Sequence, residues 1–200
     1  VVKQCKEHDI VLVYDNAYSE VAYDGYVPPS IFEVEGARDV ALEFHSMSKT
    51  YNMTGWRCGW ACGRHELTHA LATVKSFIDT GSYLAIQAAA AAALDVHDEF
   101  VPGNMAIFTE RRDAAVEAFR ANGFTCSVPK AAMYLWIPLP PHIPSKLFAE
   151  RLMEAGVIVM AGSAFGRGGE GFFRISFITS PERIREAASR AGRVLASFND

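Results

Sequence analysis

Residues 10–16 read Ile-Val-Leu-Val-Tyr-Asp-Asn. The first five are apolar or β-branched and form a run too short for a helix, which is typical of a strand covered on both faces in a parallel sheet. Asp15 follows where the run ends, and α/β sheets bind their ligands at the carboxyl ends of such strands. The stretch therefore predicts an α/β fold with Asp15 at the ligand-binding edge, although an aspartate in this place also commonly forms a turn.

Strands and helices alternate through the first half of the chain. The expected elements are strands at 10–14, 41–44 and within 56–62, and helices at 1–8, 64–77 and 82–96. This alternation is typical of an α/β architecture with a mainly parallel sheet and helices, which we assign to residues 1–100.

The pattern changes after Pro102-Gly103. A long helix is predicted at 105–121, and Asn122-Gly123 is a good stop signal for it. The remaining expected elements are strands at 124–127, 133–138, 157–160 and 172–177, and helices at 145–155 and from Pro181 onward, the latter with Ser180 as N-cap. Residues 101–200 are therefore predicted to form an α+β portion.

Composition excludes several classes of protein. The 200 residues carry 19 Lys and Arg against 23 Asp and Glu, and the net charge of −4 gives no basic field for a nucleic acid. No apolar run approaches the roughly 20 residues of a membrane helix, so no membrane partner is expected. The six histidines and four cysteines have no ligand spacing, so no metal is expected. Cysteines of this kind are commonly buried thiols in a reducing compartment, which predicts a cytoplasmic protein.

The densest group of polar side chains is Ser46-Met47-Ser48-Lys49-Thr50, followed by Gly55-Trp56-Arg57. Its serine hydroxyls and the guanidinium of Arg57 could bind a phosphate, and the Lys49 amine could attack a carbonyl. The spacing is not that of a P-loop. Tyr18 could place a phenol in the same crevice as Asp15. Together these residues predict a phosphate-binding site with a nucleophilic amine.

Three motifs resemble the class I/II pyridoxal-phosphate aminotransferases of fold type I: Asp15-Asn16-Ala17-Tyr18, the stretch 46–60, and Phe173-Arg174-Ile175-Ser176-Phe177. They occur in the order and with the separations of that family. More narrowly, residues 15–20, Asp24-Gly25-Tyr26 and residues 43–57 resemble the branch that contains LL-diaminopimelate aminotransferases and their aspartate-type relatives.

The resemblance has consequences for the whole chain. It implies pyridoxal 5′-phosphate as the cofactor. It also implies that residues 1–100 are the C-terminal part of a cofactor-binding large domain and that residues 101–200 are the small C-terminal domain. The part before the Asp15 strand would be missing, so the chain is expected to be an incomplete portion of the enzyme.

The resemblance implies roles for three residues around the cofactor ring. Lys49 would form the aldimine with the cofactor and then shuttle the substrate α-proton. Asp15 would face the pyridine nitrogen and keep it protonated, so that the ring acts as an electron sink. Tyr18 would donate a hydrogen bond to the phenolic oxygen of the ring.

The same resemblance implies binding roles for four further residues. Ser46, Ser48 and Arg57 would bind the cofactor phosphate, and Arg174 would bind the substrate carboxylate with its planar fork. Without the resemblance, Arg174 would be interpreted as a surface arginine paired with Glu170.

The implied function is transamination between a small-molecule amino acid and a 2-oxo acid, in a homodimer, with LL-diaminopimelate or aspartate as candidate donors. Two alternatives stay open. The same lysine-centred chemistry also supports a carbon–sulfur β-lyase, and the chain could be a non-catalytic fragment of the fold.

Overall fold

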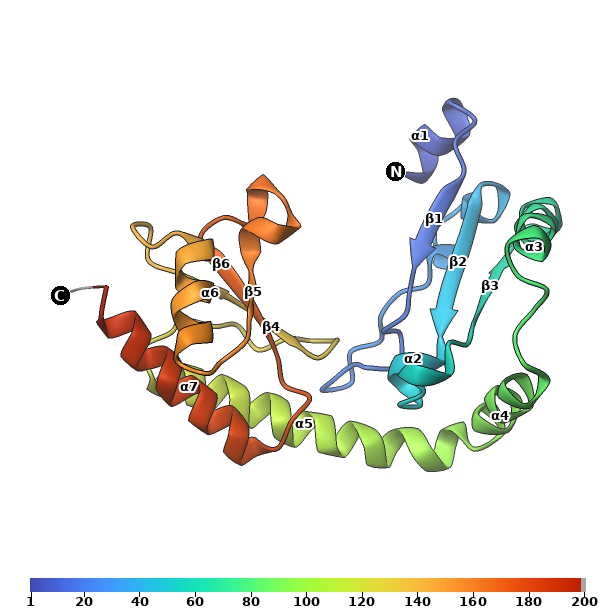
Figure 1. Cartoon of the computed structure of the whole chain (residues 1–200). Helices are drawn as coiled ribbons and strands as arrows, with labels where there is room; N and C mark the ends of the chain where they lie inside the picture. Colours follow the sequence, from blue (N-terminus) through green and yellow to red (C-terminus); the bar gives the residue numbers. More distant parts are fainter. Residues whose placement is uncertain (199–200) are drawn as a thin grey trace. The chain divides into compact units, whose positions relative to one another are not determined.

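The computed structural model describes residues 1–198. They divide into two compact units, Val1–Gly103 and the part from Asn104 onward, and each is described by itself. Helix α5 (His97–Ala121) begins in the first unit and continues into the second (Figure 1).

The first unit is built on a three-stranded sheet in the order β1-β2-β3. β1 (Leu12–Asp15) and β2 (Ala41–Ser46) are parallel, and β3 (Gly59–Gly63) is antiparallel to β2. The predicted strands are therefore present, with shifted bounds. Because β1 and β2 are parallel, Asp15 and Ser46 both end their strands at the same edge of the sheet.

The outer strand β1 is less covered than its sequence predicts. The Leu12 face packs beside a cluster of Val2, Ala37 and Ala41, contributed by α1 (Val2–Glu7), the 3-10 helix η2 (Ala37–Asp39) and β2. Val13 points to the other face and is 60% exposed. The prediction of cover on both faces is therefore wrong for the described residues, because elements pack on β1 from one side.

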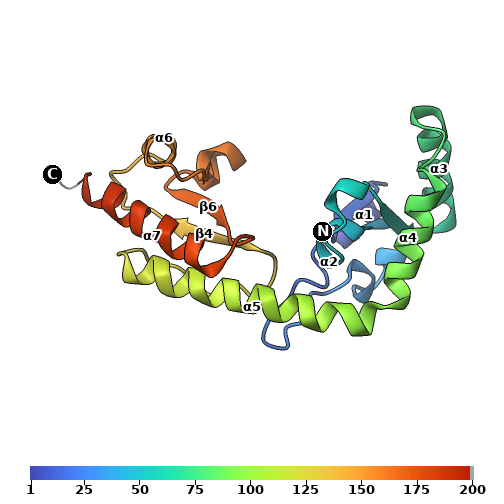
Figure 2. The same cartoon turned by 60° about the horizontal axis from the view of Figure 1, so that its bottom comes forward.

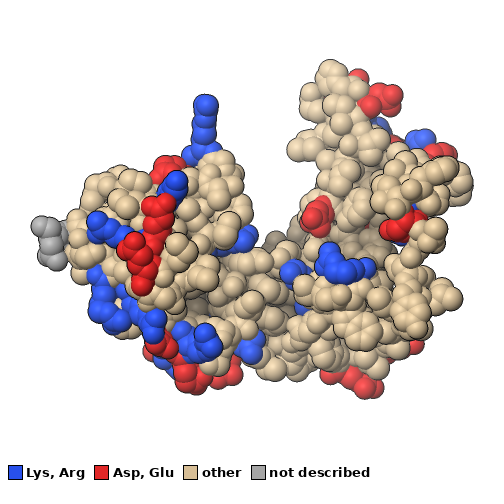
Figure 3. Space-filling model, viewed as in Figure 1, with Lys and Arg blue, Asp and Glu red and all other residues tan. Residues whose placement is uncertain are grey.

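Two helices follow the first sheet, as predicted. They are α3 (His65–Ile78) and α4 (Leu84–Asp95), and Figure 2 shows them following one another before α5. α3 has no buried residue among its fourteen described ones, and Phe77 on it is 88% exposed. Much of the visible surface of this unit carries no charged side chain (Figure 3). Val74 and Ile78 of α3 and Leu84 of α4 are also more than half exposed, so these helices present apolar side chains to the outside of the unit.

The second unit has a three-stranded antiparallel sheet in the order β4-β6-β5. Its elements after α5 are β4 (Tyr134–Pro138), α6 (Ser145–Glu154), β5 (Met160–Ala161), the 3-10 helices η4 (Gly162–Phe165) and η5 (Arg167–Gly169), β6 (Phe172–Ser176) and α7 (Pro181–Ala196). Four buried phenylalanines form the centre of its core, with ring centroids 5.0 to 6.2 Å apart in the contacting pairs: Phe119, Phe124, Phe148 and Phe173.

The expected break at Pro102 is wrong, because α5 continues through this residue. A proline in a helix removes one backbone hydrogen bond, and Pro102 is the sixth residue of α5, so this single loss falls in the second turn of a 25-residue helix. Asp98 and Glu99 in the first turn also stabilise the helix at this end.

Two predicted strands differ in the second unit. Residues 124–127 are not a strand, because the carbonyl of Cys126 accepts two hydrogen bonds from the Arg120 guanidinium, at 3.1 and 2.7 Å. The segment is thereby bonded to α5 and not to a neighbouring strand. Of the expected strand at 157–160, only Met160 pairs, with Arg174.

Two isoleucines of the second unit give a matched test of this core. Ile137 on β4 is 0% exposed, whereas Ile158 is 84% exposed. Ile137→Ala should lower the free energy of unfolding by about 2–5 kcal/mol, because it leaves a cavity. Ile158→Ala should change it by less than about 0.5 kcal/mol. Urea unfolding followed by circular dichroism measures both values, and equal losses would contradict the assigned core.

Candidate active site

The carboxyl edge of β1 carries the first predicted site residue. Asp15 is the last residue of β1, opposite Phe44 in the register, and its side chain is exposed. Within residues 1–198 its carboxylate has no hydrogen bond or ion pair. An unpaired carboxylate at this edge is free to receive a cationic or protonated ligand group.

The neighbouring edge of β2 carries Lys49. The short helix α2 (Met47–Thr50) follows β2 directly, and the hydroxyl of its N-cap, Ser46, accepts a hydrogen bond from the Ser48 backbone N–H at 3.1 Å. Lys49 Nζ lies 5.7 Å from the centroid of the Tyr18 ring. No ion pair or hydrogen bond engages this amine among the described residues. The structure thus brings Lys49 and Tyr18 together and leaves the amine available.

The loop between Lys49 and Arg57 is fixed by Thr54. The Thr54 hydroxyl donates to the Ser48 carbonyl at 2.9 Å, and the Arg57 guanidinium donates to the Thr54 carbonyl at 2.9 Å. Thr54 links two of the residues predicted to bind phosphate, and the sequence reasoning missed it. The available signal was a further hydroxyl side chain between Lys49 and Arg57.

Arg57 itself has an unusual backbone. Its φ is 55°, in the left-handed region, and Asn52 in the same loop also has a φ of 55°. This conformation costs roughly 1–2 kcal/mol for a residue with a Cβ. The bond to Thr54 helps to hold the arginine in it, so the exposed guanidinium is presented from a defined turn.

Behind this edge lies a buried carboxylate. Glu43, in the middle of β2, is 1% exposed. It accepts hydrogen bonds from the Asn16 amide at 2.8 Å, the Ser30 hydroxyl and the Ile31 backbone N–H at 3.0 Å, and its carboxylate lies 3.1 Å from Nε2 of His45. Burial alone would raise the pKa of Glu43, but these hydrogen bonds lower it below its ordinary value.

The position of Glu43 connects it to the site. Asn16 directly follows Asp15, and its backbone N–H also donates to the Phe44 carbonyl at 2.8 Å. Glu43 therefore holds the turn that begins at Asp15 and leads to Tyr18. Sequence reasoning missed this role, although a charged residue inside the apolar run 41–44 was a signal of a paired, buried carboxylate.

Arg174 lies in the second unit, on β6. Its guanidinium carbon is 4.3 Å from the centroid of the Tyr134 ring and 4.6 Å from that of Phe165. The carboxylate of Glu170 instead accepts a hydrogen bond from the Ser145 backbone N–H at 2.8 Å. The interpretation of Arg174 as the surface partner of Glu170 is therefore wrong.

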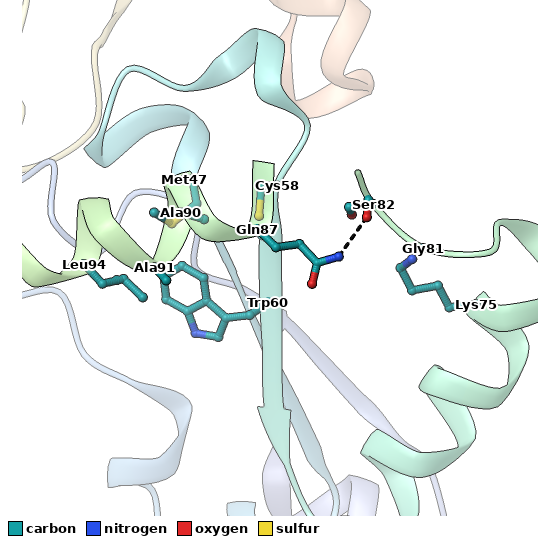
Figure 4. Close-up of a pocket in the computed structure, with 11 residues that line it drawn as sticks. Met47, Cys58, Trp60, Lys75, Gly81, Ser82, Gln87, Ala90, Ala91 and Leu94 are labelled. Atoms are coloured by element: carbon teal, nitrogen blue, oxygen red, sulfur yellow. Dashed lines mark hydrogen bonds between the residues drawn. The ribbon is translucent and has the colours of Figure 1, made fainter. Parts of the chain in front are cut away.

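A cavity of about 510 Å³ lies between β3 and α4 (Figure 4). Apolar and small side chains dominate its wall, among them Trp60 and Ala90, and the Gln87 amide donates to the Ser82 carbonyl at 2.8 Å. None of the described residues that line it is a predicted site residue. Arg57 lines a second cavity of about 610 Å³, which adjoins the first and shares Trp60, Lys75 and other lining residues with it. The candidate site is therefore defined by the sheet edge and not by the cavity in Figure 4.

Three further observations concern the described part of the chain. No group of three or more His, Cys, Asp or Glu side chains within residues 1–198 could hold a metal ion. None of the described helices is long and apolar enough to cross a membrane. The four cysteines are free thiols.

Comparison with known proteins identifies the family. The model of the family "Aminotransferase class I and II" matches residues 1–190. LL-diaminopimelate aminotransferase of Moorella thermoacetica is 46% identical over 98% of this chain and 50% of that protein. The corresponding enzyme of Gloeobacter violaceus is 48% identical over 95% of this chain and 49% of its own length.

Solved structures of aminotransferases resemble this chain. The aromatic aminotransferase of Pyrococcus horikoshii matches with a TM-score of 0.91 at 31% identity, over 99% of this chain and 54% of that one. Aspartate aminotransferase of Thermus thermophilus with maleate matches with a TM-score of 0.87 at 33% identity, over 97% of this chain and 50% of its own. The chain belongs to the aminotransferase class I and II family, as predicted, and spans about half the length of the curated relatives it matches.

Membership in this family implies pyridoxal 5′-phosphate as the cofactor. The chemistry of the edge fits this molecule. Lys49 offers an available amine for its aldehyde, Asp15 offers an unpaired carboxylate for its ring nitrogen, and Arg57 offers an exposed guanidinium for its phosphate.

The Glu43 interactions predict a pH dependence of stability. A carboxyl group whose folded pKa is lowered contributes stability above its unfolded pKa of about 4.3, and this contribution is lost as the pH falls through the folded pKa. Glu43→Gln should lower the free energy of unfolding at pH 7 by about 1–3 kcal/mol, because an amide nitrogen replaces a hydrogen-bond acceptor. Urea unfolding at a series of pH values measures the effect.

The difference in the free energy of unfolding between wild type and Glu43→Gln should begin to shrink below about pH 4.3, where the carboxyl of the unfolded chain takes up its proton. It should be smallest below the lower pKa of the folded carboxyl. Glu35→Gln is the matched control, since Glu35 is exposed in the same unit. A constant difference over the whole pH range, or an equal effect of Glu35→Gln, would contradict the role assigned to Glu43.

Proposed function

We propose that the protein transfers amino groups between an amino acid and a 2-oxo acid with pyridoxal 5′-phosphate, and that Lys49 is its catalytic residue. The observation that carries this proposal is the Lys49 amine, which lies against the Tyr18 ring without an ion pair or hydrogen bond among residues 1–198. The amine belongs to the turn that directly follows β2, at the edge where β1 ends in Asp15.

The cofactor, when bound, supplies an electron sink that stabilises negative charge at the substrate α-carbon. Lys49 would hold the cofactor through Nζ and would carry the substrate α-proton as base and acid. Asp15 would keep a proton at the ring nitrogen. Tyr18 would donate its phenolic hydrogen to the ring oxygen.

Phosphate binding is assigned to Ser46, Ser48 and Arg57. The two hydroxyls donate hydrogen bonds, and the guanidinium supplies positive charge and a planar pair of donors. Thr54 supports this arrangement, because it bonds to both the Ser48 and Arg57 parts of the loop. Ser46, Ser48 and Arg57 would hold the cofactor by its phosphate.

Arg174 binds the substrate carboxylate in this proposal. Its five N–H donors suit a two-oxygen anion, and the guanidinium has no anionic partner among the described residues. We propose LL-diaminopimelate as the amino donor, because the relatives that are 42–48% identical to the chain carry that name.

The remaining assignments concern organisation. We propose that residues 1–100 belong to the cofactor-binding domain and residues 101–200 to the small domain. The division of the chain into two compact units after Gly103 supports this assignment. We also propose a cytoplasmic homodimer. The exposed apolar side chains of α3 and α4, such as Phe77 and Leu84, support a partner for that surface.

Lys49→Ala tests the proposed nucleophile. In protein carrying this chain, the change should reduce amino transfer from LL-diaminopimelate to a 2-oxo acid by more than about a thousandfold. Borohydride reduction of the cofactor-treated wild type should attach the cofactor mass to the peptide that contains Lys49. Mass spectrometry of the digested protein locates the adduct.

Lys75→Ala is the matched control, because Lys75 lies in the same unit on α3 and pairs with Asp79. This variant should retain amino transfer and should still form the cofactor adduct on Lys49. An adduct on another lysine would contradict the assignment. Pyruvate and ammonia released from an amino acid without an oxo-acid acceptor would instead favour the β-lyase.

Arg174→Lys tests carboxylate binding separately. Lysine keeps the charge but loses the planar fork, so KM for the amino acid should rise by about tenfold or more. The Lys49 adduct should form normally, since Arg174 lies in the other unit. Steady-state kinetics measures KM, and an unchanged KM would remove Arg174 from the substrate site.

A further inference from the structure

The outer face of the second sheet carries a group of aromatic side chains around Arg174. Arg174 lies opposite Trp136 in the β4–β6 register, and strand alternation places Tyr134 and Phe172 on the same face. The opposite face carries Phe173, which belongs to the core. Arg174 therefore stands on the face that the core does not use.

Two rings contact the guanidinium directly. The Arg174 carbon Cζ is 4.3 Å from the Tyr134 centroid and 4.6 Å from the Phe165 centroid, within the roughly 6 Å reach of a cation–π interaction. The guanidinium makes no hydrogen bond or ion pair with any described residue. Its contacts are therefore with ring faces, and its N–H groups remain available to an anion.

The loop that supplies Phe165 is held tightly. A Cβ built on Gly162 would lie 2.1 Å from the Gly169 carbonyl oxygen, and one on Gly169 would lie 2.0 Å from the Gly162 carbonyl oxygen. These two backbone segments can approach so closely only because neither residue has a side chain. The Phe165 ring also contacts Trp136 edge-on, with centroids 5.5 Å apart. The position of Phe165 is thus fixed from both its backbone and its ring.

We propose that Tyr134 and Phe165 are positioning residues, which hold the Arg174 guanidinium with its N–H groups ready for a carboxylate. The proposal rests on the function proposed above for Arg174. An arginine side chain without such contacts loses conformational entropy when it binds an anion. Rings that restrict the side chain beforehand reduce that loss. Aromatic carbon also leaves the guanidinium N–H groups without competing strong acceptors.

The first test needs no substrate. In the 200-residue chain, NMR should show the side-chain protons of Arg174 shifted by the ring currents of the two neighbours. Phe165→Leu should remove a large part of that shift, whereas Phe172→Leu should retain it. Phe172 is the matched control, because it lies on the same strand and the same face as Arg174. Its ring stacks on that of Trp136, with centroids 5.4 Å apart.

The second test follows binding in protein carrying this chain. Phe165→Leu and Tyr134→Leu should each raise KM for the amino acid and the inhibition constant of maleate by about two- to fivefold, which is the contribution expected of one exposed cation–π contact. The value of kcat and the Lys49 adduct should stay close to wild type, and Phe165→Tyr should restore KM.

The outcomes separate the two proposals. Unshifted Arg174 protons, or equal effects of Phe165→Leu and Phe172→Leu on KM, would overturn the positioning role. If the Arg174 protons are shifted in the wild type but Arg174→Lys has a normal KM, the proposed function of Arg174 is overturned instead.

Discussion

The buried carboxylate of Glu43 is the constraint on which the first unit's site depends. An ionised carboxyl group removed from water is strongly unfavourable unless several donors compensate it. Here the donors come from Asn16, Ser30 and Ile31, which lie in two segments outside β2. All three hydrogen bonds form only when both segments are in place, so the placement of the Asp15 turn is energetically coupled to the burial of Glu43 in the sheet.

Local sequence pattern predicted much of this unit because the relevant signals are local. A short apolar run ended by Asp15 marked β1, and the spacing from Lys49 to Arg57 marked the loop that Thr54 closes. The partners of Glu43 could not be derived in this way. Asn16 is 27 residues from Glu43 in the chain, so their hydrogen bond depends on which strands become neighbours. Resemblance to a family supplied residue types but not this contact.

The wrong predictions for β1 and for residues 124–127 also arise from contacts between distant parts of the chain. The cover of β1 depends on elements far from it, and the exposed Val13 shows that an apolar run alone does not determine which faces are covered. Residues 124–127 have a strand-like composition, but the Arg120 side chain reaches the Cys126 carbonyl and replaces a strand partner. In both places a tertiary contact, or its absence among the described residues, outweighed local propensity.

The two arginines assigned to anions are held by different means, and the difference suits their proposed ligands. Arg57 donates to the Thr54 carbonyl from a left-handed backbone, which fixes it whether or not a ligand is present and suits a phosphate that stays bound. Arg174 is held by ring contacts that use none of its N–H donors. A substrate carboxylate must enter and leave in every turnover. Ring contacts restrict the guanidinium without a hydrogen bond that each incoming carboxylate would have to replace.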